Sequence, residues 1–237
     1  MLTLDNLHLQ LGDFRLEADL AITTGARVAL MGPSGAGKTT LLSAIAGFLA
    51  PRSGRILWNG AEITATPPGD RPLSILFQDQ NLFPHLTVVQ NIGLGLDPKL
   101  RLSAQDRDRI EATLARVGLT GLGARKPAQL SGGQQSRVAL ARALLRARPM
   151  LLLDEPFAAL GPALKGEMLA LCAEMAREQG TTVLMVSHDP QDARSLCPET
   201  VLVAEGRALA PQPTGVLLDD PPPVLAEYLG QTRRGQV

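Results

Sequence analysis

The chain has 237 residues, of which 45% are hydrophobic and 19% are charged; this is an ordinary globular composition for one large core or two lobes. The 23 lysines and arginines balance 23 aspartates and glutamates, so no basic excess draws the chain to nucleic acid or to an anionic membrane. No apolar run approaches the roughly 18 residues that span a bilayer, and the N-terminus does not read as a signal peptide.

The first third of the chain predicts strands around one helix. Period-two leucines predict a strand over 2–11 and a second over 14–22, joined by a turn at Gly12-Asp13 as an antiparallel hairpin. A buried strand over 27–31 enters a glycine-rich loop, and helical spacing follows over 38–48. A short strand at 56–58 ends in an Asn-Gly turn, and another buried strand covers 73–77.

The remainder alternates between strands and helices after a helical insertion. Strand signals stop between 87 and about 125, where residues 103–117 predict a helix capped by Ser103. Further strands are expected at 150–153, 182–186 and 201–204, with helices at 134–147, 163–179 and 224–229. The pattern predicts an α/β fold with a mostly parallel sheet, an antiparallel β edge and a helical subdomain. We expect a core domain over 1–86 and 126–237 and the helical subdomain over 87–125.

A phosphate-binding loop follows the strand at 27–31 and opens the helix at 38. It matches Gly-x-x-x-x-Gly-Lys-Ser/Thr, and with the next residue it comprises Gly32, Pro33, Ser34, Gly35, Ala36, Gly37, Lys38, Thr39 and Thr40. Glycines let backbone N–H groups converge on one anion, and the helix N-terminus adds to the field. Lys38 supplies a charge for the β- and γ-phosphates, and the Thr39 hydroxyl suits Mg²⁺. We therefore expect the chain to bind ATP with Mg²⁺.

A pair of acids ends the apolar strand at 150–153. Asp154 and Glu155 stand at its carboxyl end, which is where parallel sheets carry their sites. We expect Asp154 to join Thr39 around Mg²⁺ and Glu155 to act as the general base on the attacking water. Two solvated loop acids are the alternative, and the phosphate loop upstream argues against it.

A second anion site is expected where residues 130–134 read Leu-Ser-Gly-Gly-Gln before a helix. A hydroxyl and bare backbone at a helix N-terminus favour an anion, and the candidate residues are Ser131, Gly132, Gly133 and Gln134. Because one chain has one ATP loop, two chains packed head to tail would satisfy both sites.

These motifs resemble the ATP-binding cassette (ABC) ATPases. The resemblance rests on residues 32–39, Gln78, 130–134, 152–155 and His188, in order and at family-like spacing over about residues 2–210. It implies a phosphate-loop NTPase core of the ABC ATPase type and a homodimer that closes over two ATP molecules. It also implies that Gln78 contacts Mg²⁺ and the attacking water, and that His188 contacts the γ-phosphate. Gln78 could otherwise be a loop-capping amide, and a lone histidine is more often structural.

The resemblance further implies an importer. The loop from Gln78 to Leu86 shows apolar side chains that we expect to dock on an integral membrane permease at the cytoplasmic face of the inner membrane. A solute-binding protein would take part indirectly, and nucleic acid would not. The sequence of residues 66–96 is most similar to those of ATP-binding subunits of thiamine importers. Importers for iron, sulfate, molybdate or polyamines remain as alternatives. A non-transport cassette or a small-molecule kinase is the alternative from another class.

The sequence departs from the family pattern in two notable places. Gly161 replaces an aspartate that normally helps to couple the two sites, which puts efficient coupling in doubt. The aromatic that stacks on adenine is replaced near its usual place by Leu11, and Phe14 is the nearest aromatic, with a core role equally open.

Overall fold

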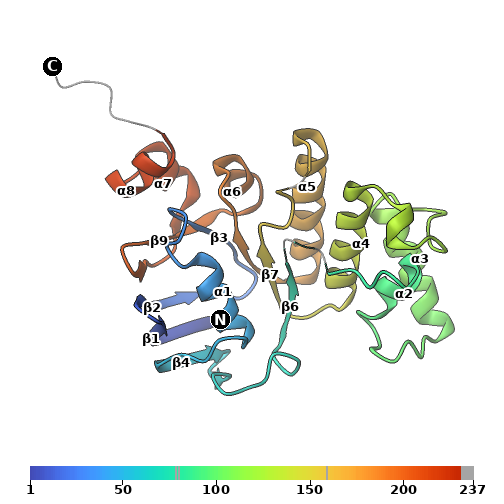
Figure 1. Cartoon of the computed structure of the whole chain (residues 1–237), viewed down its shortest axis with the longest axis horizontal. Coiled ribbons are helices and arrows are strands. Elements are labelled where there is room, and N and C mark those ends of the chain that lie inside the picture. The colour runs from blue at the N-terminus through green and yellow to red at the C-terminus, as the bar shows by residue number, and fades with distance from the viewer. Residues whose placement is uncertain (78, 80, 159, 231–237) are drawn as a thin grey trace. The chain divides into compact units, whose positions relative to one another are not determined.

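The computed structural model describes residues 1–77, 79, 81–158 and 160–230 (Figure 1). The chain divides into two compact units, Met1–Arg71 with Thr182–Val237 and Pro72–Thr181, here called the first and second unit. The expected split into a core domain and a subdomain over 87–125 stays a prediction. Among the described residues, no helix is both long enough and apolar enough to cross a membrane.

The first unit contains the predicted antiparallel β edge (Figure 1). It consists of β1 (Leu2–Leu11), β2 (Phe14–Ile22), β4 (Ser53–Trp58) and β5 (Ala61–Glu62), paired in the order β5-β4-β1-β2. Buried and exposed side chains alternate along β2, as one covered face requires. The β1 register shifts between Leu4 and Leu7, where Asn6 has a φ of 44°. The hairpin and the Asn59-Gly60 turn are confirmed.

The same unit carries parallel strands that place the phosphate loop. β3 (Arg27–Met31) lies between β8 (Thr182–Val186) and β9 (Glu199–Ala204) and is parallel to both. These strands are almost wholly buried, which explains their continuous apolar runs. Two-residue strands β10 (Arg207–Ala208) and β11 (Gln212–Pro213) pair with β9, and β10 also pairs with β2. Because β3 and β8 are parallel, the residues that follow them leave the sheet at one edge.

Helices of the first unit are short. They are α1 (Lys38–Ala46), α6 (Pro190–Leu196), α7 (Thr214–Asp219) and α8 (Pro223–Tyr228). α1 ends before the predicted residue 48 because Gly47 takes a left-handed φ of 89° and its N–H caps carbonyls of the last turn. α8 lies one residue earlier than predicted, and α6 and α7 were not predicted.

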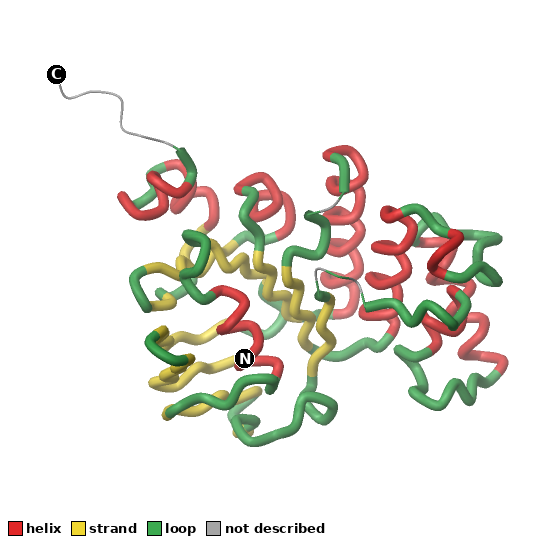
Figure 2. Tube along the Cα trace, viewed as in Figure 1, coloured by secondary structure: helices red, strands yellow, loops and turns green. Residues whose placement is uncertain are grey.

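The second unit combines one parallel strand pair with helices. β6 (Leu73–Leu76) pairs with β7 (Met150–Asp154) from Leu73↔Met150 to Leu76↔Leu153. Its helices are α2 (Val88–Gly93), α3 (Ala104–Arg116), the 3-10 turn η1 (Pro127–Gln129), α4 (Gly132–Leu145) and α5 (Pro162–Gln179). The described residues between β6 and β7 form helices and loops (Figure 2). Ser103 caps α3 as predicted, and α2, α3 and α4 share one apolar core.

Candidate functional site

Three glycines shape the loop between β3 and α1. Gly32, Gly35 and Gly37 have φ values of 146°, 77° and 100°, a region that favours glycine. A Cβ on Gly32 would stand 1.9 Å from the carbonyl oxygen of Val203, and one on Gly37 would stand 2.5 Å from Cζ of Phe14. The loop therefore depends on glycine both for its backbone angles and for the space around it.

The side chain of Lys38 lies inside this loop and bonds its backbone. It is the first residue of α1 and is 8% exposed, and its Nζ donates to the carbonyl oxygens of Gly32 at 2.7 Å and Pro33 at 2.8 Å. Ser34, Gly35 and Thr39 are exposed on the same loop, and Ala36 and Thr40 are half-buried. A charged ammonium inside a curled backbone at a helix N-terminus suits a polyphosphate.

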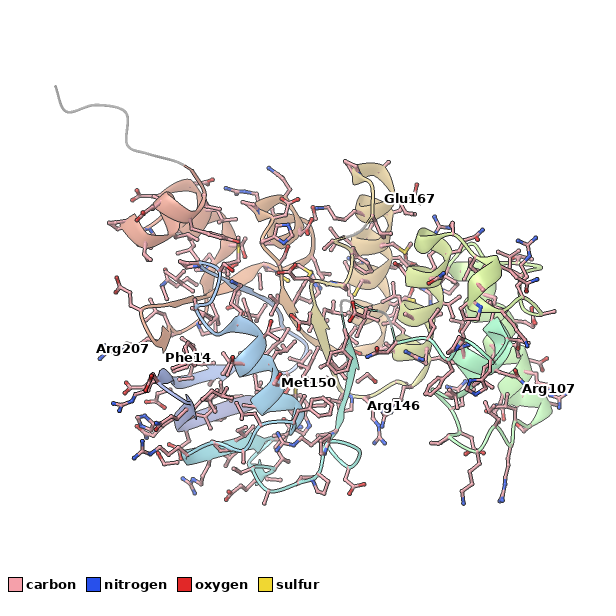
Figure 3. The ribbon with its side chains drawn as sticks, viewed as in Figure 1. Phe14, Arg107, Arg146, Met150, Glu167 and Arg207 are labelled. Carbon is pink, nitrogen blue, oxygen red and sulfur yellow. The ribbon has the colours of Figure 1, made fainter. Side chains whose placement is uncertain are left out.

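The side chain of Phe14, labelled in Figure 3, comes from the first residue of β2. It is half-buried, and its ring edge lies against Gly37. This contact gives Phe14 a packing role beneath the phosphate loop. Whether it also stacks on adenine stays a prediction.

His188 follows β8 in a braced turn. Its side chain is exposed. The preceding Ser187 donates through Oγ to Oδ2 of Asp192 at 2.8 Å and accepts from the Asp189 N–H at 3.1 Å. Since β8 is parallel to β3, His188 leaves the sheet at the same edge as the phosphate loop.

The two predicted acids lie at the carboxyl end of β7, in the second unit. Asp154 is the last residue of the strand, and Glu155 follows with a φ of 45°, which is unusual for a residue that is not glycine. Backbone strain of this kind is common at functional positions. The parallel partner β6 ends at the same edge. Gln78, two residues beyond β6, lies outside the described residues, so its expected role stays a prediction.

The turn that starts α4 is held in shape by its own side chains. Ser131 accepts through Oγ from the Gln134 N–H at 3.3 Å, and Gln134 Oε1 accepts from the Ser131 N–H at 3.0 Å. A Cβ on Gly133 would stand 2.3 Å from Cδ2 of Leu164 on α5, so a larger residue would require the Leu164 side chain to move. Ser131 and Gly132 remain exposed at the helix N-terminus. The predicted second anion site thus has a preformed backbone.

Two polar side chains, those of Asn91 and Arg142, fix the loop over residues 81–87. The amide of buried Asn91 accepts from the Phe83 N–H at 2.8 Å and donates to the carbonyls of Phe83, Leu86 and Thr87 at 3.1 to 3.2 Å. Arg142 of α4 donates to the Asn81 carbonyl at 3.0 Å and lies 6.0 Å from the Phe83 ring centroid. Burial lowers the pKa of Arg142. Phe83 itself is 46% exposed on this braced loop.

Arg71 binds the C-terminal end of α1, the helix that begins at the phosphate loop. It is 1% exposed, and its guanidinium donates to the carbonyls of Ala44 at 2.8 Å and Ile45 at 2.7 Å. It also donates to the carbonyls of Thr64 and Thr66. Burial lowers its pKa. The sequence analysis did not assign this role, and the signal available was an arginine inside a proline-rich loop next to a buried strand.

The structure thus gathers the phosphate loop and His188 in the first unit, and Asp154, Glu155 and the Ser131 turn in the second. A further residue that the sequence analysis missed is Tyr228, which contacts Lys38 and His188. The joint action of these residues on a nucleotide is proposed below.

The sequence is similar to those of known proteins. The family model described as ABC transporter matches residues 16–158. The chain is 65% identical over 230 residues to the thiamine import ATP-binding protein of Cereibacter sphaeroides, covering 97% of this chain and 100% of the relative. It is 57% identical to the protein of the same name from a Ruegeria species, with the same two coverages of 97% and 100%.

Solved structures agree as well. A dimeric ABC transporter cassette matches with a TM-score of 0.79 at 31% identity, covering 90% of this chain and 99% of that chain. A dimeric cassette in a post-hydrolysis state, bound to ADP and Pi, matches with a TM-score of 0.77 at 32% identity and the same coverages of 90% and 99%. The predicted α/β phosphate-loop fold and the predicted ATPase class are thereby confirmed, and the chain belongs to the ABC transporter family.

Proposed function

We propose that this chain is the ATP-hydrolysing subunit of an importer whose cargo is thiamine. The observation that carries the proposal is the phosphate loop, with Lys38 buried in it, on a chain 65% identical to a thiamine import ATP-binding protein. No described residue argues for a cargo by its chemistry, so the cargo rests on that likeness. Importers for iron, sulfate, molybdate or polyamines are the alternative.

The nucleotide's phosphates would lie on the loop from Gly32 to Thr40. The Lys38 ammonium would donate to them, and the loop N–H groups and the N-terminus of α1 would add to the attraction. Thr39, Asp154 and Gln78 offer a hydroxyl, a carboxylate and an amide oxygen, which is the hard-oxygen donor set that Mg²⁺ prefers. Magnesium when bound would neutralise charge on the β- and γ-phosphates.

Glu155 would accept the proton of the attacking water, and His188 would donate to the γ-phosphate. The left-handed backbone of Glu155 and the braced turn around His188 support these roles. Glu155→Gln should retain nucleotide binding and lose most turnover, because the amide is isosteric but cannot take the proton. Normal hydrolysis by this variant would remove Glu155 from the role of base.

The active form would be a homodimer. Ser131, Gly132, Gly133 and Gln134 of one copy would contact the γ-phosphate held by Lys38 of the other. The exposed, prefolded turn at Ser131 supports this, as does the likeness to cassettes solved as dimers. Closure would exclude water and align the nucleophile.

The membrane partner would be a permease that receives the loop from Gln78 to Leu86, which would place the chain peripherally at the cytoplasmic face of the inner membrane. The half-exposed Phe83 on a loop braced by Asn91 and Arg142 supports a docking surface. The double variant Phe83→Ala with Leu86→Ala should lose co-purification with the permease and retain basal ATPase activity. Undiminished co-purification would contradict this assignment.

The cargo is tested in the assembled transporter. The chain would be co-expressed with its permease and solute-binding protein and reconstituted in vesicles, and ATPase activity would be measured with each solute in turn. Thiamine should stimulate hydrolysis, and iron, sulfate, molybdate and polyamines should not. Stimulation by one of these others instead would replace the cargo. A chain that phosphorylates a small acceptor rather than driving transport would overturn the importer class.

A further inference from the structure

The last described helix, α8, contacts the first unit through one fully buried residue. It follows Pro221 and Pro222, and of its six residues Leu225 alone is fully buried. A cavity of about 560 Å³ lies beside its beginning, lined by Pro222 and Val224 on one side and by Leu202 and Leu209 on the other. Two residues therefore anchor α8: Leu225 near its middle and the residue at its C-terminal end.

That residue is Tyr228, the single tyrosine of the chain. The ring centroid lies 5.8 Å from Nζ of Lys38, which stands over the ring face. The phenol hydroxyl donates to the backbone carbonyl oxygen of His188 at 3.5 Å. Tyr228 thus links α8 to two residues that the proposed function assigns to the phosphates.

An aromatic ring and a polyphosphate are competing partners for Lys38. The negative face of the ring attracts the ammonium group, an interaction that a strongly charged anion exceeds. The same negative face is unfavourable beside an anion, because the ring quadrupole repels it. Lys38 also donates to Gly32 and Pro33, so its head is held while the ring contact is exchanged.

We propose that Tyr228 is a further residue of the nucleotide site, whose ring covers Lys38 when no nucleotide is bound and yields to the phosphates when ATP binds. α8 is then a strap that responds to occupancy of the phosphate loop, with room to move in the adjoining cavity. This inference rests on the proposed binding of ATP at Lys38.

The first test measures the affinity of the full-length chain for Mg·ATP by titration calorimetry. Tyr228→Leu removes the ring and should bind at least about twofold more tightly, which is the lower limit of what a cation–π contact supplies. Tyr228→Phe keeps the ring but loses the hydroxyl that bonds His188, so its affinity should lie between those of the wild type and Tyr228→Leu. The matched control Glu227→Ala, on the exposed side of α8, should bind like the wild type.

Tyr228→Leu binding with unchanged or weaker affinity would overturn the inference while leaving the proposed function intact. A wild-type chain without affinity for Mg·ATP would overturn both.

The second test follows the ring itself. Because the chain has one tyrosine, 3-fluorotyrosine labels Tyr228 alone and gives one ¹⁹F resonance. Saturating Mg·ATP should shift that resonance, and Lys38→Ala should shift it without nucleotide, since the ring loses its cation. Magnesium alone should leave it in place. A resonance that saturating Mg·ATP does not move would overturn the inference.

Discussion

Cζ of Phe14 lies 2.5 Å from the position that a Cβ on Gly37 would occupy. Phe14 therefore supports the phosphate loop by packing. We expect Phe14→Ala to weaken binding of Mg·ATP and of magnesium tripolyphosphate by the same factor, about tenfold or about 1.4 kcal/mol. Calorimetry on both ligands checks this, with Phe48→Ala, an exposed aromatic 56% accessible after α1, as control. A much larger loss for ATP would mean that the ring stacks on adenine.

Alanine substitutions of the loop glycines should differ in how much stability they cost. Gly32→Ala would drive a Cβ to 1.9 Å from the Val203 carbonyl of β9, whereas nothing lies within 4 Å of the same atom on Gly35. We expect Gly32→Ala to lower the free energy of unfolding by more than about 3 kcal/mol and Gly35→Ala by about 1–2 kcal/mol, the cost of a left-handed backbone. Urea unfolding of both variants measures the difference, and equal losses would contradict it.

Ser131 and Ser103 form a matched pair of caps. Each accepts a hydrogen bond from the third residue of its helix and has a side chain from that residue bonded back to its own N–H. Alanine at either position should cost about 1 kcal/mol of stability, because the cap chemistry is the same. Ser131→Ala should in addition lower ATPase activity at saturating ATP by at least about tenfold, as the loss of a hydrogen bond to a charged group implies. Equal activities of the two variants would remove Ser131 from the site.

Arg71 should be a stability residue rather than a catalytic one. Arg71→Met leaves buried carbonyls of the α1 terminus without their donor, and we expect a loss of about 3 kcal/mol in the free energy of unfolding. Arg107→Met, on the exposed face of α3, should change it by less than about 0.5 kcal/mol. Urea denaturation measures both, and a small effect of Arg71→Met would contradict the role of the guanidinium clamp.

The sequence predicted those parts of the structure whose signals are local. Strands β1, β2, β3 and β8 were predicted with their observed bounds, because alternation and apolar runs are read over neighbouring residues. The loop around Lys38 was predicted because phosphate binding requires glycines, a lysine and a hydroxyl at fixed spacing, and residues 32–39 have all of them. Helices α6 and α7, of seven and six residues, are short enough that their periodicity is weak, whereas α8, of similar length, follows the prolines Pro221 and Pro222.

The remaining site features depend on residues far apart in the chain. Tyr228 reaches Lys38 across 190 positions of sequence (228 − 38), and Arg71 reaches Ala44 across 27. Neither local pattern nor spacing encodes such contacts, since they depend on how segments far apart in the chain pack against one another. The expected roles of Gln78 and Gly161 stay predictions.

The most direct measurement of the central claim is the affinity of Lys38→Ala for Mg·ATP, determined by calorimetry beside the wild type and Lys99→Ala, an exposed lysine outside the loop. The Lys38 variant should bind at least about tenfold more weakly, because a buried charge-assisted hydrogen bond to phosphate is lost, and Lys99→Ala should bind like the wild type. Equal affinity of Lys38→Ala and the wild type would contradict the assignment of the phosphate loop.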